Sequence, residues 1–140
     1  MSNTSNTNNM SYANNANNIL LDIKNLKVSF FTPAGEVKAI NDVSIQMEEG
    51  DVLGIVGESG SGKSVTAYSI MGLIPFPGRI VDGTIDFNSH RINDMTEAQL
   101  RAMRGNEVSI IFQDPMTSLN PVYTIGNQIR EVLFLHTDLD

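Results

Sequence analysis

Residues Val56–Ser64 read V-G-E-S-G-S-G-K-S, and this stretch decides the fold class. It satisfies the pattern G-x-x-x-x-G-K-[ST], with the fixed positions at Gly57, Gly62, Lys63 and Ser64. In this pattern a glycine-rich backbone points its N–H groups at a phosphate. A short apolar run precedes the stretch and a helix-compatible segment follows it, which is the context that the pattern requires. The sequence therefore predicts a phosphate-binding loop between a strand and a helix.

Each residue type in this loop has a physical role. The N–H groups of about Gly60 to Ser64 would form the cradle, and the helix that begins near Lys63 adds the positive end of its dipole. The Lys63 ammonium can reach the outer phosphates, and the Ser64 hydroxyl can ligate magnesium. Binding of a nucleoside triphosphate follows. The alternative, a flexible glycine-serine turn, does not explain the strand before the loop and the helix after it.

The composition narrows the class of protein. The chain has 140 residues, which fits one domain, and 41% of them are hydrophobic, near the norm for a folded protein. Its net charge of -7, with only 9 lysines and arginines, argues against binding to a nucleic-acid backbone, which needs a clustered basic face. Cysteine is absent from the sequence, which excludes disulfides, thiolate zinc sites and a cysteine nucleophile, and fits a reducing compartment.

The sequence predicts no membrane span, and its N-terminus predicts no secretory signal. No apolar run approaches the roughly 18 to 20 residues of a span, and the start lacks a basic and then apolar stretch, so we expect a cytoplasmic chain. Residues 1–18 are dominated by asparagine, with serine and threonine filling most of the remainder. Such a tract buries too little apolar surface to offset its ordering entropy. We therefore expect a disordered tail over residues 1–18 and a domain over residues 19–140.

The pattern after residue 18 predicts an antiparallel hairpin. The apolar residues of its first strand change parity near Asn25, which indicates a bulge or bend there. They are Leu21, Ile23, Leu26, Val28 and Phe30. A turn over residues 32–35 leads to a second, half-exposed strand, whose apolar residues share one parity. They are Val37, Ala39, Val43, Ile45 and Met47.

Two short apolar runs predict strands of another kind. Residues 51–56 (D-V-L-G-I-V) and 108–112 (V-S-I-I-F) show no alternation, which is typical of strands buried on both faces of a parallel sheet. Between them we expect a helix over 64–74, a strand over 79–87 and a helix that runs from the N-cap Thr96 to Gly105. A final helix is expected from about residue 125 to 136. The fold class predicted is α/β, with the antiparallel hairpin as an N-terminal subdomain.

Several segments resemble the ATP-binding subunits of ABC transporters, in the same order along the chain. G-E-S-G-S-G-K-S-V-T-A looks like the phosphate loop of the family, and L-L-D-I-K-N-L-K-V-S-F looks like its first strand. V-D-G-T-I-D-F resembles the segment before a family hairpin, although Asn88-Ser89 stands where a glycine is more usual. I-I-F-Q-D-P-M-T-S-L-N-P is similar to the oligopeptide, dipeptide and nickel importers in particular, and contains the Q-loop glutamine of the family at Gln113. The resemblance runs from about Leu20 to the C-terminus and implies the N-terminal part of an ABC-type nucleotide-binding domain.

The resemblance implies roles for individual residues. Phe30, with Phe31 as second candidate, matches an aromatic residue that stacks on adenine, whereas an aromatic residue in a strand is otherwise usually core. Gln113 matches a residue that touches magnesium or the attacking water, while its loop meets a coupling helix of the membrane subunit. On spacing alone, Gln113 would merely end a strand.

The expected site has three sets of residues. The nucleotide site comprises Phe30, Gly57, Glu58, Ser59, Gly60, Ser61, Gly62, Lys63, Ser64 and Val65. Glu58 and Ser59 are expected to serve loop shape and phosphate contact, and Glu58 is not expected to be catalytic. The expected catalytic residues are Lys63 and Gln113, and the expected magnesium ligands are Ser64 and Gln113.

The sequence lacks other motifs that the family uses for catalysis. These are a second acidic strand end, a signature loop L-S-G-G-Q and a switch histidine. His90 and His136 do not stand in the context of that histidine, so we expect both at the surface. Without these groups, charge stabilisation during hydrolysis is incomplete, and we do not expect this chain alone to hydrolyse ATP. Strands that would flank residues 51–56 are also missing, so we expect low stability or poor solubility.

Three interpretations follow. The first is an ATP-binding subunit of an ABC importer for peptides or nickel, with ATP and Mg²⁺ as cofactors, on the inner face of the cell membrane. Its expected partners are transmembrane permease subunits, met through the Q-loop region, and a second ATP-binding subunit. A different phosphate-loop enzyme, such as a small-molecule kinase, is disfavoured by Q-D-P-M-T-S-L-N-P and by the hairpin. A remnant that binds nucleotide or a membrane partner without hydrolysis stays open, because the sequence does not separate it from the first interpretation.

Overall fold

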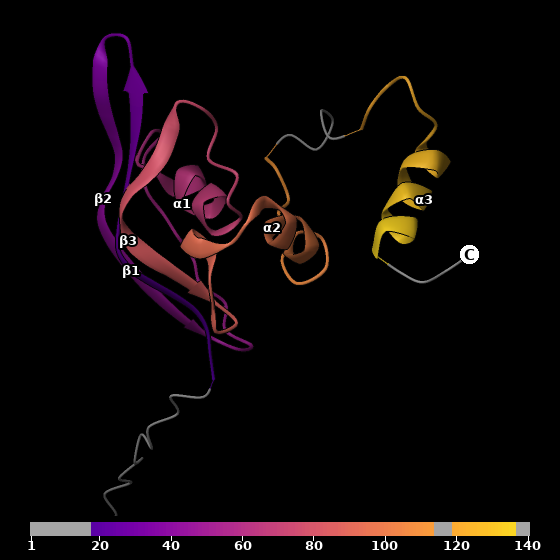
Figure 1. Ribbon diagram of the computed structural model, residues 1–140, viewed down its shortest axis with the longest axis horizontal. Coiled ribbons are helices and arrows are strands. Elements are labelled where there is room, and N and C mark those ends of the chain that lie inside the picture. The colour runs from indigo at the N-terminus through magenta and orange to yellow at the C-terminus, as the bar shows by residue number, and fades with distance from the viewer. Residues whose placement is uncertain (1–17, 114–118, 137–140) are drawn as a thin grey trace, which may run out of the picture.

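The computed structural model describes residues 18–113 and 119–136, so all but the last residue of the expected tail lies outside the described residues. One antiparallel sheet has the strand order β2-β1-β3-β4. Helix α1 lies beside the sheet, α2 lies farther from it, and α3 lies farthest away (Figure 1). The strands are β1 (Ile19–Thr32), β2 (Gly35–Glu48), β3 (Gly78–Phe87) and β4 (His90–Arg91). The helices are α1 (Lys63–Ile70), the 3-10 turn η1 (Ile92–Asp94), α2 (Glu97–Met103) and α3 (Ile125–His136).

The predicted hairpin is confirmed as the pair β1 and β2, with Thr32 opposite Gly35 at its turn. The predicted bulge is also confirmed, because the register shifts between Ile23 and Leu26 and Asn25 has a φ of 50°. Across the hairpin, the side-chain amide of Asn25 donates to Asp42 Oδ1 at 2.9 Å. Asp42 has a φ of 63°, and the register of β2 shifts beside it.

The prediction of a single parity along β2 is wrong, and the shift beside Asp42 is the physical reason. Ile40, which that parity would place outward, is buried. The extra residue between Val43 and Ile40 exchanges the two faces of β2 at Ile40. The core side of β2 therefore combines Ile40 with Val43, Ile45 and Met47.

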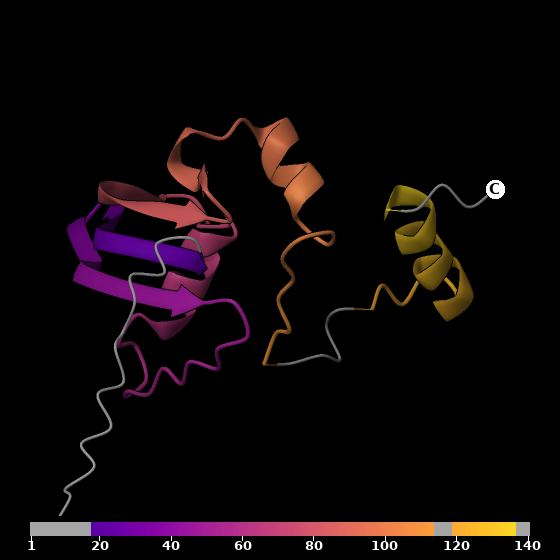
Figure 2. The ribbon, with the colours of Figure 1, turned by 90° about the horizontal axis from the view of Figure 1, so that it is seen from below.

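The core lies between one face of the sheet and the helices that cover it (Figure 2). Its buried members are Leu21, Ile23, Leu26, Val28, Ile40, Ile85, Phe87, Ile92 and Met103. Two polar residues of α1 are also buried, and both hydroxyls donate to helix carbonyls: Thr66 to Gly62 O at 3.0 Å and Ser69 to Val65 O at 2.7 Å. Paired in this way, they carry no cost of an unsatisfied buried group.

The helices agree with the predictions in kind and differ in length. The capping box of α2 is confirmed, since Thr96 Oγ1 accepts from the Gln99 N–H and Gln99 Oε1 accepts from the Thr96 N–H at 2.8 Å. The helix predicted over residues 64–74 ends at Ile70, because Gly72 adopts a left-handed φ of 62° and stops it. The strand predicted over residues 79–87 and the helix over residues 125–136 are confirmed.

The two strands predicted over residues 51–56 and 108–112 are not formed, and those predictions are wrong for this chain. Val52 is 98% exposed and Ile111 is 93% exposed, where burial on both faces was expected. An isolated parallel bridge between Arg104 and Val108 is the nearest approach to a ladder there. A strand satisfies its backbone N–H and C=O groups only against neighbours. The described residues place no strand beside either segment.

The last described helix, α3, lies apart from the sheet in both views (Figures 1 and 2). It carries a set of exposed apolar side chains: Ile125, Ile129, Val132, Leu133, Phe134 and Leu135. In the described part of the chain, no helix combines the length and the apolar character that a transmembrane segment requires.

Candidate functional site

The predicted phosphate loop leads directly into the N-terminus of α1. Within the loop, the Ser61 N–H donates to Glu58 O at 3.2 Å, which closes a tight turn. Gly62 is the N-cap residue, and no side chain caps the N–H groups of the first turn. That turn also lacks an acidic side chain. The N-terminal end of α1 therefore presents uncapped N–H groups and a positive dipole, which together attract an anion.

Gly62 is required where it stands. Its φ is 92°, in the left-handed region, and a Cβ atom built on it would lie 2.7 Å from the backbone oxygen of Ala39 in β2. No residue with a side chain fits so close to a backbone oxygen. This contact sets the N-terminus of α1 against the sheet and so fixes where the loop lies.

Lys63 holds the loop in shape through its ammonium group. Its Nζ donates to Gly57 O at 2.7 Å, to Glu58 O at 2.6 Å and to Ser61 Oγ at 3.3 Å. Beside it is a hollow of about 140 Å³, lined by Ala39, Gly60, Ser61, Gly62, Lys63, Ser64 and Val65. A positive charge and helix N–H groups around a hollow of this kind fit a phosphate group.

Ser64 stands in the wall of this hollow with an exposed side chain. Its hydroxyl forms no hydrogen bond with the rest of the described chain, so it is available to a cation. Within residues 18–113 and 119–136, no group of three His, Asp or Glu side chains could hold a metal ion. Magnesium here would therefore rely on Ser64 and on oxygens other than the carboxylates of the described residues, such as those of phosphates.

Phe30 and Phe31 lie in different environments. Phe30 is half-buried and packs against the core, with its ring beside Gly78 and Ile74. Phe31 is 38% exposed and lies under the guanidinium of Arg79, 4.3 Å from the ring centroid. Successive side chains of a strand point to opposite faces, so Phe30 shares the core-facing side that α1 covers.

Phe30 is also close to the hollow along the sheet. Its ladder partner on β2 is Val37, and Ala39, two positions further along β2, lines the hollow. Two strand residues span about 7 Å. Phe30 is therefore the better placed of the two aromatic residues for a base whose phosphates lie at Gly62.

Gln113 follows a residue whose ring contacts α1. The ring of Phe112, the preceding residue, lies 6.3 Å from the ring of Tyr68 at an interplanar angle of 46°. Tyr68 follows Ser64 by about one turn of α1. Gln113 is exposed, and no hydrogen bond joins it to Ser64. The remainder of the expected Q-loop, residues 114–118, lies outside the described residues.

Comparison with known proteins decides the family. The sequence profile described as "ABC transporter" matches residues 40–138, which is most of the chain. This chain belongs to the ABC transporter family. The family and the fold class that the sequence predicted are thereby confirmed.

Curated relatives of this ABC family member are ATP-binding proteins. It is 50% identical over 119 residues to the oligopeptide transport ATP-binding protein OppD of Salmonella typhimurium, a match that covers 85% of this chain and 35% of that protein. It is 51% identical over 117 residues to the dipeptide transport ATP-binding protein DppD of Lactococcus lactis subsp. cremoris, covering 84% of this chain and 34% of that one. The chain thus spans about a third of the length of these relatives.

A solved structure shows the same fold. An ATP-binding cassette, described as a dimer in a post-hydrolysis state bound to ADP and Pi, superimposes with a TM-score of 0.73 at 22% identity. The match covers 86% of this chain and 49% of the cassette. The described residues of this ABC family member therefore have the fold of one part of an ATP-binding cassette.

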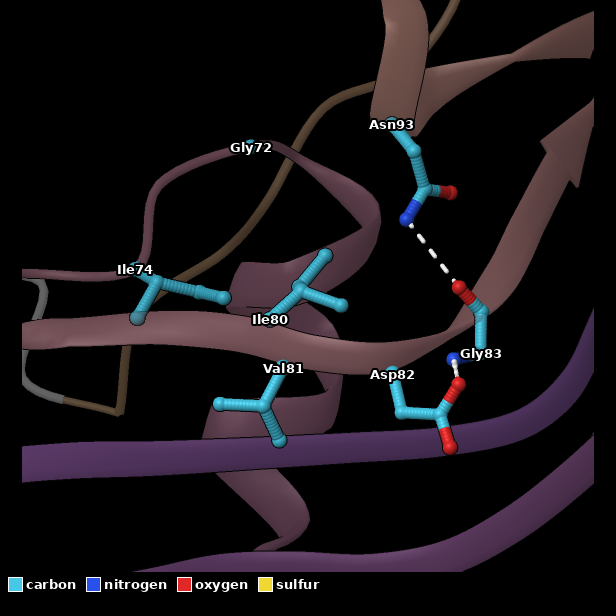
Figure 3. Close-up of a pocket in the computed structure, with 7 residues that line it drawn as sticks. All are labelled: Gly72, Ile74, Ile80, Val81, Asp82, Gly83 and Asn93. Atoms are coloured by element: carbon cyan, nitrogen blue, oxygen red, sulfur yellow. Dashed lines mark hydrogen bonds between the residues drawn. The ribbon is translucent and has the colours of Figure 1, made fainter. Parts of the chain in front are cut away.

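A larger cavity, of about 380 Å³, lies elsewhere and offers less to a ligand (Figure 3). It is lined by Gly72, Ile74, Ile80, Val81, Asp82, Gly83 and Asn93. The Gly83 N–H donates to Asp82 Oδ1 at 2.8 Å, and the Asn93 amide donates to Gly83 O at 3.3 Å. Asp82 also pairs with Lys27 at 2.9 Å. Because its polar groups bond to one another or to neighbouring residues, the phosphate loop remains the candidate site.

Two residues of the site escaped sequence reasoning. Ala39 lines the hollow, and its backbone oxygen lies close to Gly62. Tyr68 contacts Phe112, the residue before Gln113. The sequence pattern gives no sign of a role for this alanine, because its role is to let the backbone of Gly62 come close to β2. Tyr68 falls on the predicted helix, where an aromatic residue suggests packing without naming its partner. Of the two histidines, His90 is exposed, as expected, and the side chain of His136 lies outside the described residues.

Proposed function

We propose that this chain is part of the ATP-binding subunit of an ABC importer that takes up peptides. The observation that carries the proposal is the phosphate loop itself: Lys63 and uncapped helix N–H groups surround a hollow at the start of α1. Relatives at about 50% identity are oligopeptide and dipeptide transport ATP-binding proteins, which supports peptides as the cargo.

In this proposal the chain's own residues hold ATP at three points. The loop from Gly57 to Val65 binds the phosphates through backbone N–H groups, and Lys63 turns its ammonium towards the outer phosphates. Ser64 and Gln113 ligate Mg²⁺, which offsets the negative charge of the phosphate oxygens when it is bound. Phe30 stacks on the adenine ring. Residues 19–140 form one continuous part of the nucleotide-binding domain.

Hydrolysis and transport need groups that these residues do not include. The second acidic strand end, the signature loop and the switch histidine are not in the sequence. We propose that they belong to the remainder of the subunit and to a second ATP-binding subunit, and that strands of that remainder cover residues 51–56 and 108–112. Permease subunits would meet the Q-loop region at the inner face of the membrane.

Calorimetry with Mg-ATP tests the binding step. The 140-residue chain is titrated beside Lys63→Ala and a matched control, Lys24→Ala. Lys24 is a lysine whose Nζ lies 2.8 Å from Asp22 Oδ2 in an ion pair of β1, away from the loop. Loss of charge-assisted bonds to phosphate should weaken binding by at least about tenfold in Lys63→Ala, and Lys24→Ala should bind like the parent chain.

Phosphate release on the same samples tests the catalytic step. We expect no release above background from the chain alone, because the water-activating groups are absent from it. Binding that survives Lys63→Ala would refute the assignment of the phosphate loop. Turnover by the isolated chain would contradict the division of labour proposed here and would favour another phosphate-loop enzyme.

A further inference from the structure

The C-terminal end of α1 is closed by a specific backbone motif. The Leu73 N–H donates to Tyr68 O at 2.8 Å, and the Gly72 N–H donates to Ser69 O at 3.1 Å, with Gly72 in the left-handed region. These two bonds form a Schellman motif. They leave the carbonyl oxygens of Met71 and Gly72 beyond the helix without helical donors, at the negative end of its dipole.

Arg104 satisfies both carbonyls at once. Its Nε donates to Met71 O at 2.8 Å and its Nη2 donates to Gly72 O at 2.8 Å. Its Nη1 donates to Glu97 Oε1 at 2.9 Å, and the side chain is only 19% exposed. A planar guanidinium can make these three bonds in fixed directions, whereas an ammonium cannot. Arg104 therefore joins the end of α2 rigidly to the end of α1.

The segment that follows Arg104 leads to Gln113. It turns through Gly105, whose N–H donates to Val108 O at 2.9 Å, and then runs to Phe112, whose ring meets Tyr68. Between Ser109 and Gln113 no hydrogen bond ties the chain to other described residues. At its start this segment is held by the Arg104 bonds, by the Asn88 amide, which donates to Glu107 Oε2 at 3.3 Å, and by Val108, which packs against the core. At its end it is held by the Phe112 ring. Arg104 is the contact that ties the start of the segment directly to α1.

We propose that Arg104 is a positioning residue that sets where Gln113 stands relative to the phosphate loop. Helix α1 connects the phosphate loop to Arg104: the loop leads into the N-terminus of α1, and Arg104 donates to the carbonyl oxygens just beyond its C-terminus. A shift of α1 on nucleotide binding would then be passed to the Gln113 segment. This inference rests on the proposed function for its nucleotide step, while its structural step stands on the bonds of Arg104.

Hydrogen exchange with and without Mg-ATP tests the proposal on the 140-residue chain. The variants are Arg104→Met, which keeps length without donors, Arg104→Lys, which keeps charge without the fork, and Glu97→Gln as control. In the parent chain, Mg-ATP should slow exchange over residues 105–113. Arg104→Met should lose that response while its Kd for Mg-ATP stays within about threefold, because Arg104 does not touch the loop. Arg104→Lys should recover part of the response, and Glu97→Gln should retain it.

A merely structural role would give another result. Arg104→Met would then lower stability but keep the slowing of residues 105–113 by Mg-ATP, and that outcome overturns the proposal. If Arg104→Met does not fold, Arg104→Lys decides, since a full parent-like response would equally overturn it. If the parent chain does not bind Mg-ATP, the proposed function fails separately. Exchange over residues 105–108, whose N–H groups are hydrogen-bonded, should still rise about tenfold without nucleotide in the Arg104 variants. Unchanged exchange there would refute the positioning role of Arg104.

Discussion

Two regions of this chain are built from the same types of apolar residue and differ completely in burial. In the sheet, Ile23 is 1% exposed and Val28 is fully buried. In the segments 51–56 and 108–112, valine and isoleucine are open to solvent, as at Val52 and Ile111. Hydrophobicity alone therefore does not bury a strand.

The difference lies in where each strand finds its neighbour. β1 reaches β2 through the two residues Pro33 and Ala34, so the ladder closes locally. A parallel strand needs neighbours that are a crossover away in sequence. For residues 51–56 and 108–112 the described chain contains no such neighbours, and their apolar side chains remain exposed.

The largest effect expected from this comparison is on the free energy of unfolding. Leu26 is fully buried in the sheet core, so Leu26→Ala should lower that free energy by about 2–5 kcal/mol through a lost transfer term and a cavity. Val52→Ala should change it by less than about 0.5 kcal/mol, because Val52 is already solvated. Urea denaturation followed by circular dichroism measures both. A large cost at Val52 would mean that residues 51–56 are packed in solution.

A smaller effect is expected where the loop meets the sheet. Gly62 and Gly50 both have a positive φ, but an added Cβ meets the Ala39 oxygen at Gly62 and nothing within 4 Å at Gly50. Gly50→Ala should therefore cost only the left-handed conformation, about 1 kcal/mol, and Gly62→Ala roughly 1–3 kcal/mol more. The same denaturation experiment measures the pair. Equal costs would show that the contact with Ala39 is loose.

The smallest effect concerns charge on the exposed side of the sheet. The side-chain hydrogen bonds from Arg91 to Asp86, at 2.8 and 3.0 Å, lower the pKa of Asp86 below its ordinary value of 3.8. A carboxyl group whose folded pKa is depressed stabilises the fold above its unfolded pKa, and this contribution is lost as the pH falls through the folded pKa.

Denaturation below pH 4 measures that contribution. The parent chain should lose stability from about pH 4 downwards, and Asp86→Asn should lose less over the same range, by at most about 1 kcal/mol for a partly exposed pair. An identical acid dependence in both proteins would show that the Asp86–Arg91 pair adds nothing to the sheet.

Most local structure could be predicted from sequence because its causes are local. Thr96 and Gln99 specify their capping box. The parity change near Asn25 predicts a bulge, which the register shift between β1 and β2 confirms. The predicted parity of β2 was wrong because Asp42 causes a second shift that no alternation in the apolar residues reveals. The prediction of strands over residues 51–56 and 108–112 was wrong because an apolar run shows only that a strand would have to be covered. It does not show that the covering strands are present.

For the candidate site, the sequence by itself determined the loop, because G-x-x-x-x-G-K-S specifies both the conformation and the charge of an anion cradle. Through resemblance to the family, it also predicts that an aromatic residue and a glutamine belong near that loop. Only the tertiary structure decided that Phe30 shares the core-facing side with α1 while Phe31 lies under Arg79. It alone placed Ala39 against Gly62 and Arg104 on the end of α1. Such contacts join residues far apart in the chain, and their geometry depends on how the sheet and helices pack, which no local pattern encodes.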